Sequence, residues 1–239
     1  KIVIIGAGVA GLTLASLLQT NSDFEFVVYE KGEMLNLDEG FGIQLSVNSV
    51  SILNKIGFNQ LNKSEKYNPA KLDFYSINYN KLCDIDLTLF NSENVKYTTL
   101  KRSTLIKFLK RKLFSNSIIF RKKINDVSQI DDKIKINFID GSSDKADYLI
   151  VSDGVFSYSK SVVEKKNIFP NYFGAIAVRT QITKQDISNL NSSNISLIMG
   201  SNVHLALYPV NQDKQINLVC IMRTKLEDHA SIKKFLENL

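Results

Sequence analysis

The sequence has no tryptophan, and only two histidines, two cysteines and three prolines among its 239 residues. The two cysteines, Cys83 and Cys220, stand far apart and have no metal-binding spacing, which excludes a zinc site of the paired-cysteine type. So few cysteines favour a reducing, cytoplasmic setting, and we expect both to be small hydrophobic residues of the core. No apolar run reaches the roughly 18 residues that a membrane-spanning helix needs.

Positive charge exceeds negative charge only modestly, with a formal net charge of +6. Part of it lies in residues 107–114 (KFLKRKLF) and 121–123 (RKK), which we interpret as a solvated helix face and the entry to a strand. No nucleic-acid-binding motif accompanies these stretches, so we expect no nucleic-acid partner. Weak association with an anionic membrane surface stays open. The composition, 44% hydrophobic and 23% charged, is that of a globular protein.

The first thirty residues carry the most informative pattern. Residues 1–6 (KIVIIG) form a continuous β-branched run, which is typical of a buried parallel strand. Residues 11–19 place apolar side chains at helical spacing, and residues 24–30 (FEFVVYE) form a second strand-like run. The order of strand, glycine turn, helix and strand predicts a βαβ unit.

The turn inside this unit fits G-x-G-x-x-G, with Gly6, Gly8 and Gly11. In such a turn the first glycine allows a tight bend, the second lets a pyrophosphate approach the backbone, and the third lets the helix pack on the sheet. The helix N-terminus then favours the phosphate charge. Glu30 ends the next strand, where its carboxylate can accept hydrogen bonds from an adenosine ribose. We predict a dinucleotide site; a tight turn in a nucleotide-free α/β fold is the alternative, and the pattern does not separate NAD from FAD.

The rest of the chain alternates between helical and strand-rich segments. Residues 31–46 are predicted to be a loop, and residues 69–99 to form antiparallel strands. The next helix has Ser103 as its expected N-cap. Short strands follow with a turn at Asp140-Gly141, and a second β-rich block begins near residue 173. The predicted fold class is therefore α/β, interleaved with β-rich segments.

Several stretches together carry a resemblance to a known family. They are VIIGAGVAGLTLASLL with VVYEK, GFGIQLSVNSVSILNKIG, LKRSTLIKFL, DGSSDKADYLIVSDGVFSYSK, FGAIAVRTQI and HLALYPV. In this order they resemble the FAD-dependent class A aromatic-ring monooxygenases, which include para-hydroxybenzoate, salicylate and ubiquinone-pathway hydroxylases. The resemblance spans most of the chain, up to about residue 223.

The resemblance implies FAD as the cofactor and NADH or NADPH as the reductant. Arg102 would reach the pyrophosphate, Gln44 the ribityl chain, and Ile124 the adenine through its backbone. Asp153-Gly154 would contact ribose or phosphate. The alternatives are a surface arginine for Arg102, a strand-edge polar residue for Gln44 and a helix N-cap for Asp153. The expected cofactor-binding residues are Gly6, Ala7, Gly8, Val9, Ala10, Gly11, Glu30, Lys31, Gln44, Arg102, Ile124, Asp153 and Gly154; no catalytic residue and no metal ligand is assigned.

The resemblance also implies two interleaved domains. A Rossmann-like FAD-binding domain would comprise residues 1–68 and 101–168, and a β-sheet substrate domain residues 69–100 and 169–239. The implied reaction is hydroxylation of a small aromatic or phenolic substrate with O₂, through a flavin C4a-hydroperoxide. The family carries a further Gly-Asp and Ala-His segment after the substrate sheet. That segment is not found here, so we expect the chain to be truncated at its C-terminal side relative to the family.

Other functions stay open. The chain can be a non-catalytic dinucleotide-binding fragment, or another flavoprotein such as an epoxidase or prenyl reductase; a halogenase should carry a tryptophan motif, which is absent. A plain NAD dehydrogenase leaves Arg102 and Asp153-Gly154 unexplained. The sequence indicates neither the substrate nor the oligomeric state. Polar residues of the expected substrate sheet and the tail have no assigned role: Arg179, His204, Tyr208, Arg223 and His229.

Overall fold

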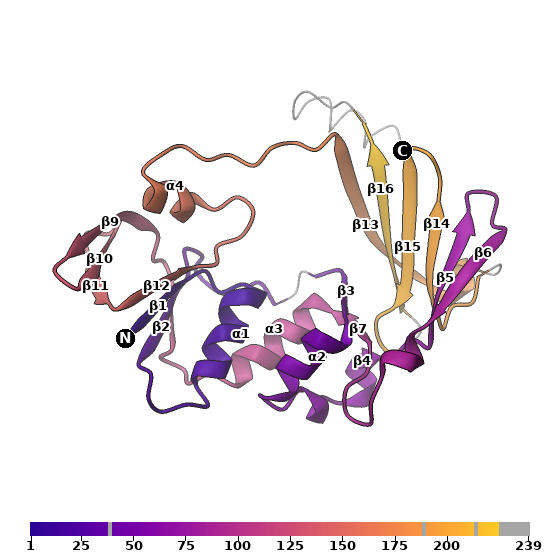
Figure 1. The fold of residues 1–239 in the computed structure, drawn as a ribbon, viewed down its shortest axis with the longest axis horizontal. Helices are drawn as coiled ribbons and strands as arrows, with labels where there is room; N and C mark the ends of the chain where they lie inside the picture. The colour runs from indigo at the N-terminus through magenta and orange to yellow at the C-terminus, as the bar shows by residue number, and fades with distance from the viewer. Residues whose placement is uncertain (38–39, 188–189, 213–214, 225–239) are drawn as a thin grey trace. The chain divides into compact units, whose positions relative to one another are not determined.

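The computed structural model describes residues 1–37, 40–187, 190–212 and 215–224. The chain divides into two compact units, each assembled from three segments (Figure 1). Unit 1 comprises residues 1–40, 48–61 and 102–170, and unit 2 comprises residues 41–47, 62–101 and 171–239. The predicted domain boundaries differ from this division mainly in placing residues 41–47 and 62–68 in the first domain.

Unit 1 is built on a parallel sheet of four strands in the order β12-β1-β2-β8. The bounds are Ile2–Ile5 for β1, Phe26–Tyr29 for β2, Ile118–Ile119 for β8 and Tyr148–Val151 for β12. Helix α1 (Val9–Leu18) connects β1 to β2, so the predicted βαβ unit is confirmed. The β-branched side chains of Val3, Ile4 and Val28 are fully buried, as a parallel sheet covered on both faces requires.

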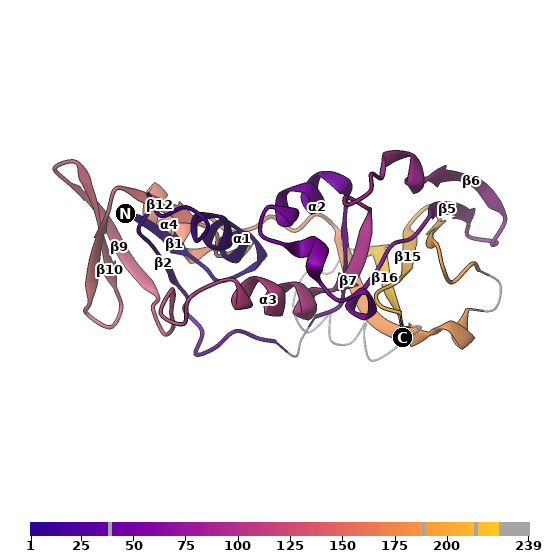
Figure 2. The same cartoon turned by 90° about the horizontal axis from the view of Figure 1, so that it is seen from below.

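Helices and a small antiparallel sheet complete unit 1. Helix α3 (Arg102–Arg111) packs against α1. The single O–H of Ser16 in α1 is shared between the carbonyl oxygens of Leu12 and of Leu109 in α3, at 2.7 and 3.3 Å. Val3 and Ile5 share a hydrophobic cluster with Ile136 of the antiparallel sheet. Figure 2 shows these elements from below. The remaining bounds are Val47–Asn54 for α2, Ile124–Ile130 for β9, Lys133–Phe138 for β10, Ser143–Ala146 for β11 and Tyr158–Glu164 for α4.

Unit 2 contains a six-stranded sheet in the order β13-β16-β15-β14-β5-β6, antiparallel except where β14 pairs with β5. A second sheet has the order β3-β7-β4. The bounds are Gly42–Leu45 for β3, Lys66–Tyr67 for β4, Lys71–Ser76 for β5, Lys81–Asp86 for β6, Thr98–Lys101 for β7, Ala175–Thr183 for β13, Ile195–Met199 for β14, Val203–Pro209 for β15 and Gln215–Arg223 for β16.

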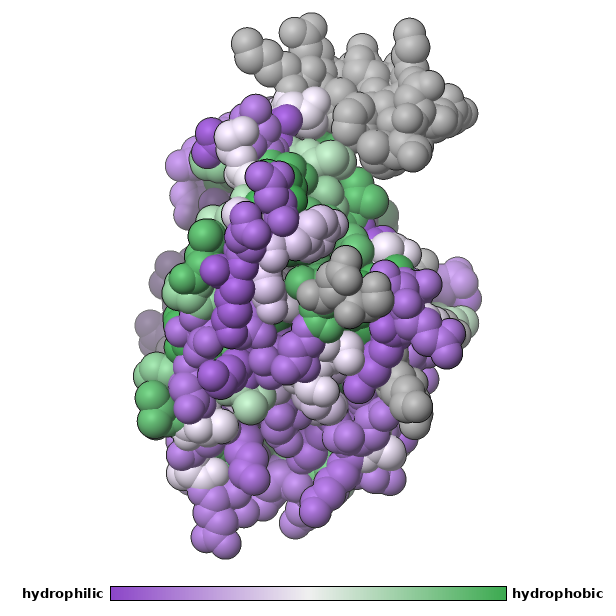
Figure 3. All heavy atoms as spheres, turned by 90° about the vertical axis from the view of Figure 1, so that its right-hand side faces the viewer, coloured by the Kyte–Doolittle hydropathy of each residue, from purple (hydrophilic) through white to green (hydrophobic). Residues whose placement is uncertain are grey.

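Strand β6 is an edge of the larger sheet and exposes charged side chains. Lys81 lies 2.8 Å from the buried carboxylate of Asp73 and 2.7 Å from that of Asp84. Figure 3 views the structure from the side on which β6 lies in Figure 1, and mainly hydrophilic residues cover that face. Charge of this kind protects a sheet edge from pairing with another chain.

Three local predictions are corrected by the structure. The expected loop at residues 31–46 contains β3, whose half-buried backbone becomes a strand by pairing with β7. Helix α3 begins at Arg102, so Ser103 lies inside the helix and is not its N-cap. Cys83 is exposed on the edge strand β6 and Cys220 is half-buried, so Cys83 is not a core residue.

None of the helices in the described ranges is long and apolar enough to cross a membrane.

Candidate functional site

The turn between β1 and α1 needs glycine at two positions for reasons internal to the chain. Gly6 has φ +102°, and a Cβ there would lie 2.7 Å from the carbonyl oxygen of Ser152. At Gly11 a Cβ would come within 2.0 Å of the carbonyl oxygen of Gly6. Both glycines therefore let β1, β12 and α1 approach one another, which is the packing role predicted for the third glycine of the pattern.

Gly8 is different, because no contact within the described chain requires glycine there. Its φ of −80° is open to any residue, and a Cβ would meet nothing within 4 Å. It is the N-cap of α1, a position where Ser, Thr or Asp would usually stabilise the helix, yet no side chain caps this helix. The backbone at this position is open to a ligand, and the N-terminus of a helix attracts anions.

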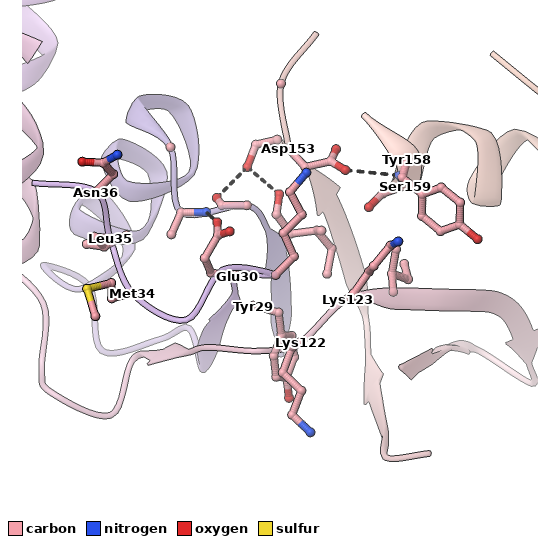
Figure 4. A pocket seen from close by; sticks show the side chains of 18 of the residues that line it. Tyr29, Glu30, Met34, Leu35, Asn36, Lys122, Lys123, Asp153, Tyr158 and Ser159 are labelled. Atoms are coloured by element: carbon pink, nitrogen blue, oxygen red, sulfur yellow. Dashed lines mark hydrogen bonds between the residues drawn. The ribbon is translucent and has the colours of Figure 1, made fainter. Parts of the chain in front are cut away.

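Glu30 fixes the same turn from the end of β2. Its Oε2 accepts a hydrogen bond from the backbone N–H of Ala7 at 2.8 Å, and its Oε1 accepts one from Gly32 at 2.8 Å. Figure 4 shows the carboxylate next to the turn. Each carboxylate oxygen has a further lone pair, so Glu30 can accept hydrogen bonds from ribose hydroxyls while it holds the turn.

Asp153 and Gly154 form the turn that follows β12. Gly154 has φ +88°, a conformation that favours glycine. The Asp153 carboxylate accepts hydrogen bonds from the Ser157 hydroxyl and from the backbone N–H of Ser159, the latter at 3.2 Å. Ser157 in turn caps α4 by accepting from the N–H of Lys160 at 3.0 Å. The alternative interpretation of Asp153 as a helix N-cap is therefore wrong: Asp153 supports the cap, which is Ser157.

These elements surround a pocket of about 360 Å³ that lies wholly within unit 1 (Figure 4). Gln44, by contrast, belongs to unit 2, and Val9, Ala10 and Gly11 are residues of α1 that do not line the pocket. The expected cofactor-binding residues that line it are Gly6, Ala7, Gly8, Glu30, Lys31, Arg102, Ile124, Asp153 and Gly154.

Positive charge is in excess at the pocket wall. Besides Lys122, which is paired with Asp140, the lining includes Lys31, Arg102 and Lys123, but only two carboxylates, each of which already accepts backbone N–H bonds. Among the residues that the structure describes, no carboxylate forms an ion pair with Arg102. A guanidinium at the first residue of α3, beside a helix N-terminus, suits a diphosphate.

Sequence reasoning missed several residues of the lining. Lys122 donates from its ammonium to Asp140 and Ser142, both at 2.6 Å, and Figure 4 shows it directed away from Asp153. Tyr29 donates to Asp144 at 2.9 Å; burial and this carboxylate raise the pKa of Tyr29. No spacing pattern marks such residues, because the packing of strands distant in sequence brings them to the pocket. The other missed residues are Ile5, Met34, Leu35, Asn36, Ile106, Lys123, Ser152, Tyr158 and Ser159.

Gln44 makes a defined contact inside unit 2. Its Oε1 accepts a hydrogen bond from the Tyr97 hydroxyl at 2.8 Å, and burial raises the pKa of Tyr97. The hydroxyl of Tyr208 donates to the carbonyl of Gly42 at 2.7 Å, and burial raises the pKa of Tyr208 to about 12. The side chains of these two tyrosines therefore hold β3 in place.

The other polar residues noted in the expected substrate sheet are exposed: Arg179 of β13, His204 of β15 and Arg223 of β16. His229 lies outside the described residues. No group of three or more His, Cys, Asp or Glu side chains that could hold a metal occurs within the described ranges.

Comparison with family models first bears on the N-terminal part of the chain. Residues 4–35 match the model of an NAD(P)-binding Rossmann-like domain. The predicted fold class is confirmed: unit 1 has a Rossmann-like parallel sheet, interleaved with the β-rich unit 2.

Comparison with individual proteins then identifies relatives that match most of the chain. The chain is 25% identical over 228 residues to 3-amino-4-hydroxybenzoate 2-monooxygenase of Streptomyces cremeus, covering 92% of this chain and 56% of the relative. It is 22% identical over 233 residues to salicylate hydroxylase of Pseudomonas putida, covering 92% and 53%. Its fold matches that of Klebsiella pneumoniae HpxO complexed with FAD and uric acid, with a TM-score of 0.81 at 18% identity, covering 100% and 61%.

These matches confirm the predicted resemblance: the chain is similar to flavin-dependent aromatic-ring monooxygenases along almost its whole length. It spans about half the length of the curated relatives that it matches.

Proposed function

We propose that the pocket of unit 1 binds the adenosine diphosphate half of FAD. The observation that carries this proposal is the contrast among the glycines: Gly6 and Gly11 are required by packing, whereas Gly8 leaves an open cradle at the N-terminus of α1. A diphosphate fits this cradle because it can approach the backbone closely and meets the positive end of the helix dipole.

The chain's own residues divide the binding between them. The open backbone at Gly8, the N-cap of α1, takes the diphosphate, and Arg102 neutralises its charge. Glu30 accepts hydrogen bonds from the ribose hydroxyls, while its bond to the N–H of Ala7 keeps the cradle rigid. Ile124 and the Asp153-Gly154 turn close the pocket at the ends of β9 and β12. Lys31 adds positive charge near the ribose.

We further propose that the protein acts as a monooxygenase on a small aromatic or phenolic substrate, with O₂ and with NADH or NADPH as the reductant. FAD, when bound, supplies the redox chemistry that activates O₂. The relatives' printed activities on aminohydroxybenzoate and salicylate support this class of reaction. In this proposal the β-rich unit is the substrate domain, and Gln44 contacts the ribityl chain, as the resemblance implies. A cytoplasmic location and weak membrane-surface association stay predictions.

One observation favours a second candidate, a dinucleotide-binding polypeptide without turnover of its own. The pocket is built by unit 1 alone, and the chain spans about half of its relatives. Binding can therefore occur even where catalysis needs more polypeptide than these 239 residues.

A flavin spectrum combined with turnover separates the two candidates. The purified chain is incubated with FAD and desalted, its visible spectrum is recorded, and NADH or NADPH oxidation is followed with salicylate or 4-hydroxybenzoate. Retained flavin with substrate-dependent oxidation and a hydroxylated product, identified by mass spectrometry, supports the monooxygenase. Retained flavin without product supports the binding polypeptide, and a protein that takes up no FAD contradicts both.

A further inference from the structure

Tyr158 stands out among the residues that line the pocket. It is the first residue of α4 and its side chain is 45% exposed, although it lies on the wall of a partly enclosed site. Among the described residues its hydroxyl has no hydrogen-bond partner. An aromatic ring in such a place presents a flat apolar surface to whatever enters the pocket.

The backbone around this ring is held firmly. Asp153 accepts hydrogen bonds from the hydroxyl of Ser157 and the N–H of Ser159, the residues on either side of Tyr158. The conformational freedom of Tyr158 is thus limited to its own side chain, and Figure 4 shows its ring beside Lys123. Pre-organised aromatic surfaces of this kind lose little entropy on binding.

Lys123 completes a small recognition unit with Tyr158. Its ammonium lies 4.9 Å from the centroid of the Tyr158 ring, within the range of a cation–π interaction. Within the described part of the chain it has no carboxylate partner, whereas its neighbour Lys122 is bound to Asp140. An ammonium that contacts an aromatic ring, and is not paired with a carboxylate, is available to donate hydrogen bonds to a ligand.

We propose that Tyr158 and Lys123 bind the adenine ring of the dinucleotide, with Tyr158 as the stacking surface and Lys123 as a hydrogen-bond donor to the purine nitrogens. This inference rests on the proposed function. The chemistry argues for a base: stacking on an aromatic side chain is favourable for a flat heterocycle, and purine nitrogens are acceptors that match an unpaired ammonium. Glu30, which also lines the pocket, offers acceptors to the attached ribose.

The test is calorimetric titration with ADP and, as the probe with a smaller base, CDP. Tyr158→Leu should weaken ADP binding about tenfold and CDP binding much less, because stacking is worth more for the larger ring. Tyr158→Phe should keep the affinity for ADP within about twofold. Lys123→Gln should weaken ADP binding several-fold. Tyr148→Leu, which removes an exposed tyrosine of β12 outside the pocket, is the matched control and should bind as the unmodified chain does.

The outcomes separate a wrong adenine site from a wrong proposed function. If Tyr158→Leu and Lys123→Gln bind ADP as tightly as the unmodified chain, the assignment of the adenine site is wrong while the proposed function stands. If the unmodified chain binds neither ADP nor FAD, the proposed function fails and this inference falls with it. If Tyr158→Leu does not fold, Tyr158→Phe and Lys123→Gln still carry the test: a loss of ADP affinity in the Phe variant equal to that in the Gln variant would contradict stacking.

Discussion

At the scale of single residues, the three glycines of the turn differ in what lies beside each of them. Gly6 and Gly11 leave room for neighbouring backbone, whereas the space beside Gly8 is filled by no atom of the described chain. Glu30 is likewise used twice, since its oxygens hold two backbone N–H groups and keep lone pairs for a ligand. Structure and binding can therefore be separated by mutation at this turn.

The first prediction separates the glycines. Gly11→Ala places a Cβ 2.0 Å from a backbone oxygen and should lower the free energy of unfolding by about 2 kcal/mol or more. Gly8→Ala meets no protein atom, so its unfolding free energy should stay within about 1 kcal/mol of the unmodified chain. Its affinity for ADP should nevertheless fall at least about tenfold, since the methyl group keeps the diphosphate from the backbone. Urea denaturation and calorimetric titration measure the two effects; a Gly8→Ala variant that is stable and binds ADP normally contradicts the cradle.

The second prediction concerns Glu30. Glu30→Gln keeps one acceptor oxygen but turns an amide NH₂ toward one of the two backbone N–H groups. The free energy of unfolding should therefore fall by about 1–3 kcal/mol. ADP affinity should fall as well, because the ribose loses an acceptor. Glu33→Gln, which removes only an exposed ion pair with Arg121, is the control and should change stability by less than about 1 kcal/mol. Equal stability of the two variants would show that Glu30 does not hold the turn.

At the scale of elements, the sequence predicts those parts whose signals are local. The run of Ile and Val before a glycine turn predicted β1 and α1, and Asp140-Gly141 predicted the turn between β10 and β11, where Gly141 has φ +83°. Strand β3 was missed, because a short segment that begins with glycine becomes a strand only through its pairing with β7. Cys83 was misplaced in the core, because one strand's alternation does not reveal that the strand is a sheet edge.

The residues of the candidate site also divide into those that a local motif predicts and those that only packing brings together. Gly6, Gly8 and Glu30 stand in one continuous motif whose spacing has a physical reason, and all three line the pocket. Tyr158 and Lys123 come from α4 and from the segment before β9, and their meeting depends on how α4 packs against β9. Nothing in the local sequence encodes that contact.

A third prediction belongs to the β10–β11 hairpin. Hydrogen bonds from Lys122 and then Ser142 lower the pKa of Asp140 to about 2 from its ordinary 3.8. A carboxylate with a depressed folded-state pKa stabilises fully above the ordinary pKa, and this contribution is lost as the pH falls from about 4 to about 2. Asp140→Asn should therefore make the unfolding free energy less dependent on pH in that window.

The measurement is urea denaturation at several pH values between about 2 and 5. Asp132→Asn serves as the control, because Asp132 is an exposed carboxylate in the neighbouring β9–β10 turn without a lysine partner among the described residues. The control should keep the pH dependence of the unmodified chain. An unchanged slope in Asp140→Asn would show that its contacts with Lys122 and Ser142 contribute nothing in solution.

At the scale of the whole molecule, two interleaved units make separate contributions. Unit 1 carries the pocket, the glycine turn and the basic lining, and unit 2 carries the large sheet and the tyrosines around β3. ADP at a hundred times its dissociation constant should stabilise the state that binds it by about 2.7 kcal/mol. Hydrogen exchange should then slow in unit 1, at residues 5–12, 28–36 and 152–159. Slower exchange confined to the six-stranded sheet would place the nucleotide elsewhere.

The central claim is that the turn at Gly6–Gly11 binds the adenosine diphosphate half of FAD, and competition between FAD and ADP tests it most directly. The fluorescence anisotropy of FAD is followed as the purified chain is added, and ADP is then titrated into the complex. We predict that FAD binds, that ADP displaces it fully, and that Gly8→Ala weakens both ligands together. FAD that binds but is not displaced by saturating ADP, or that binds Gly8→Ala unchanged, would contradict this account.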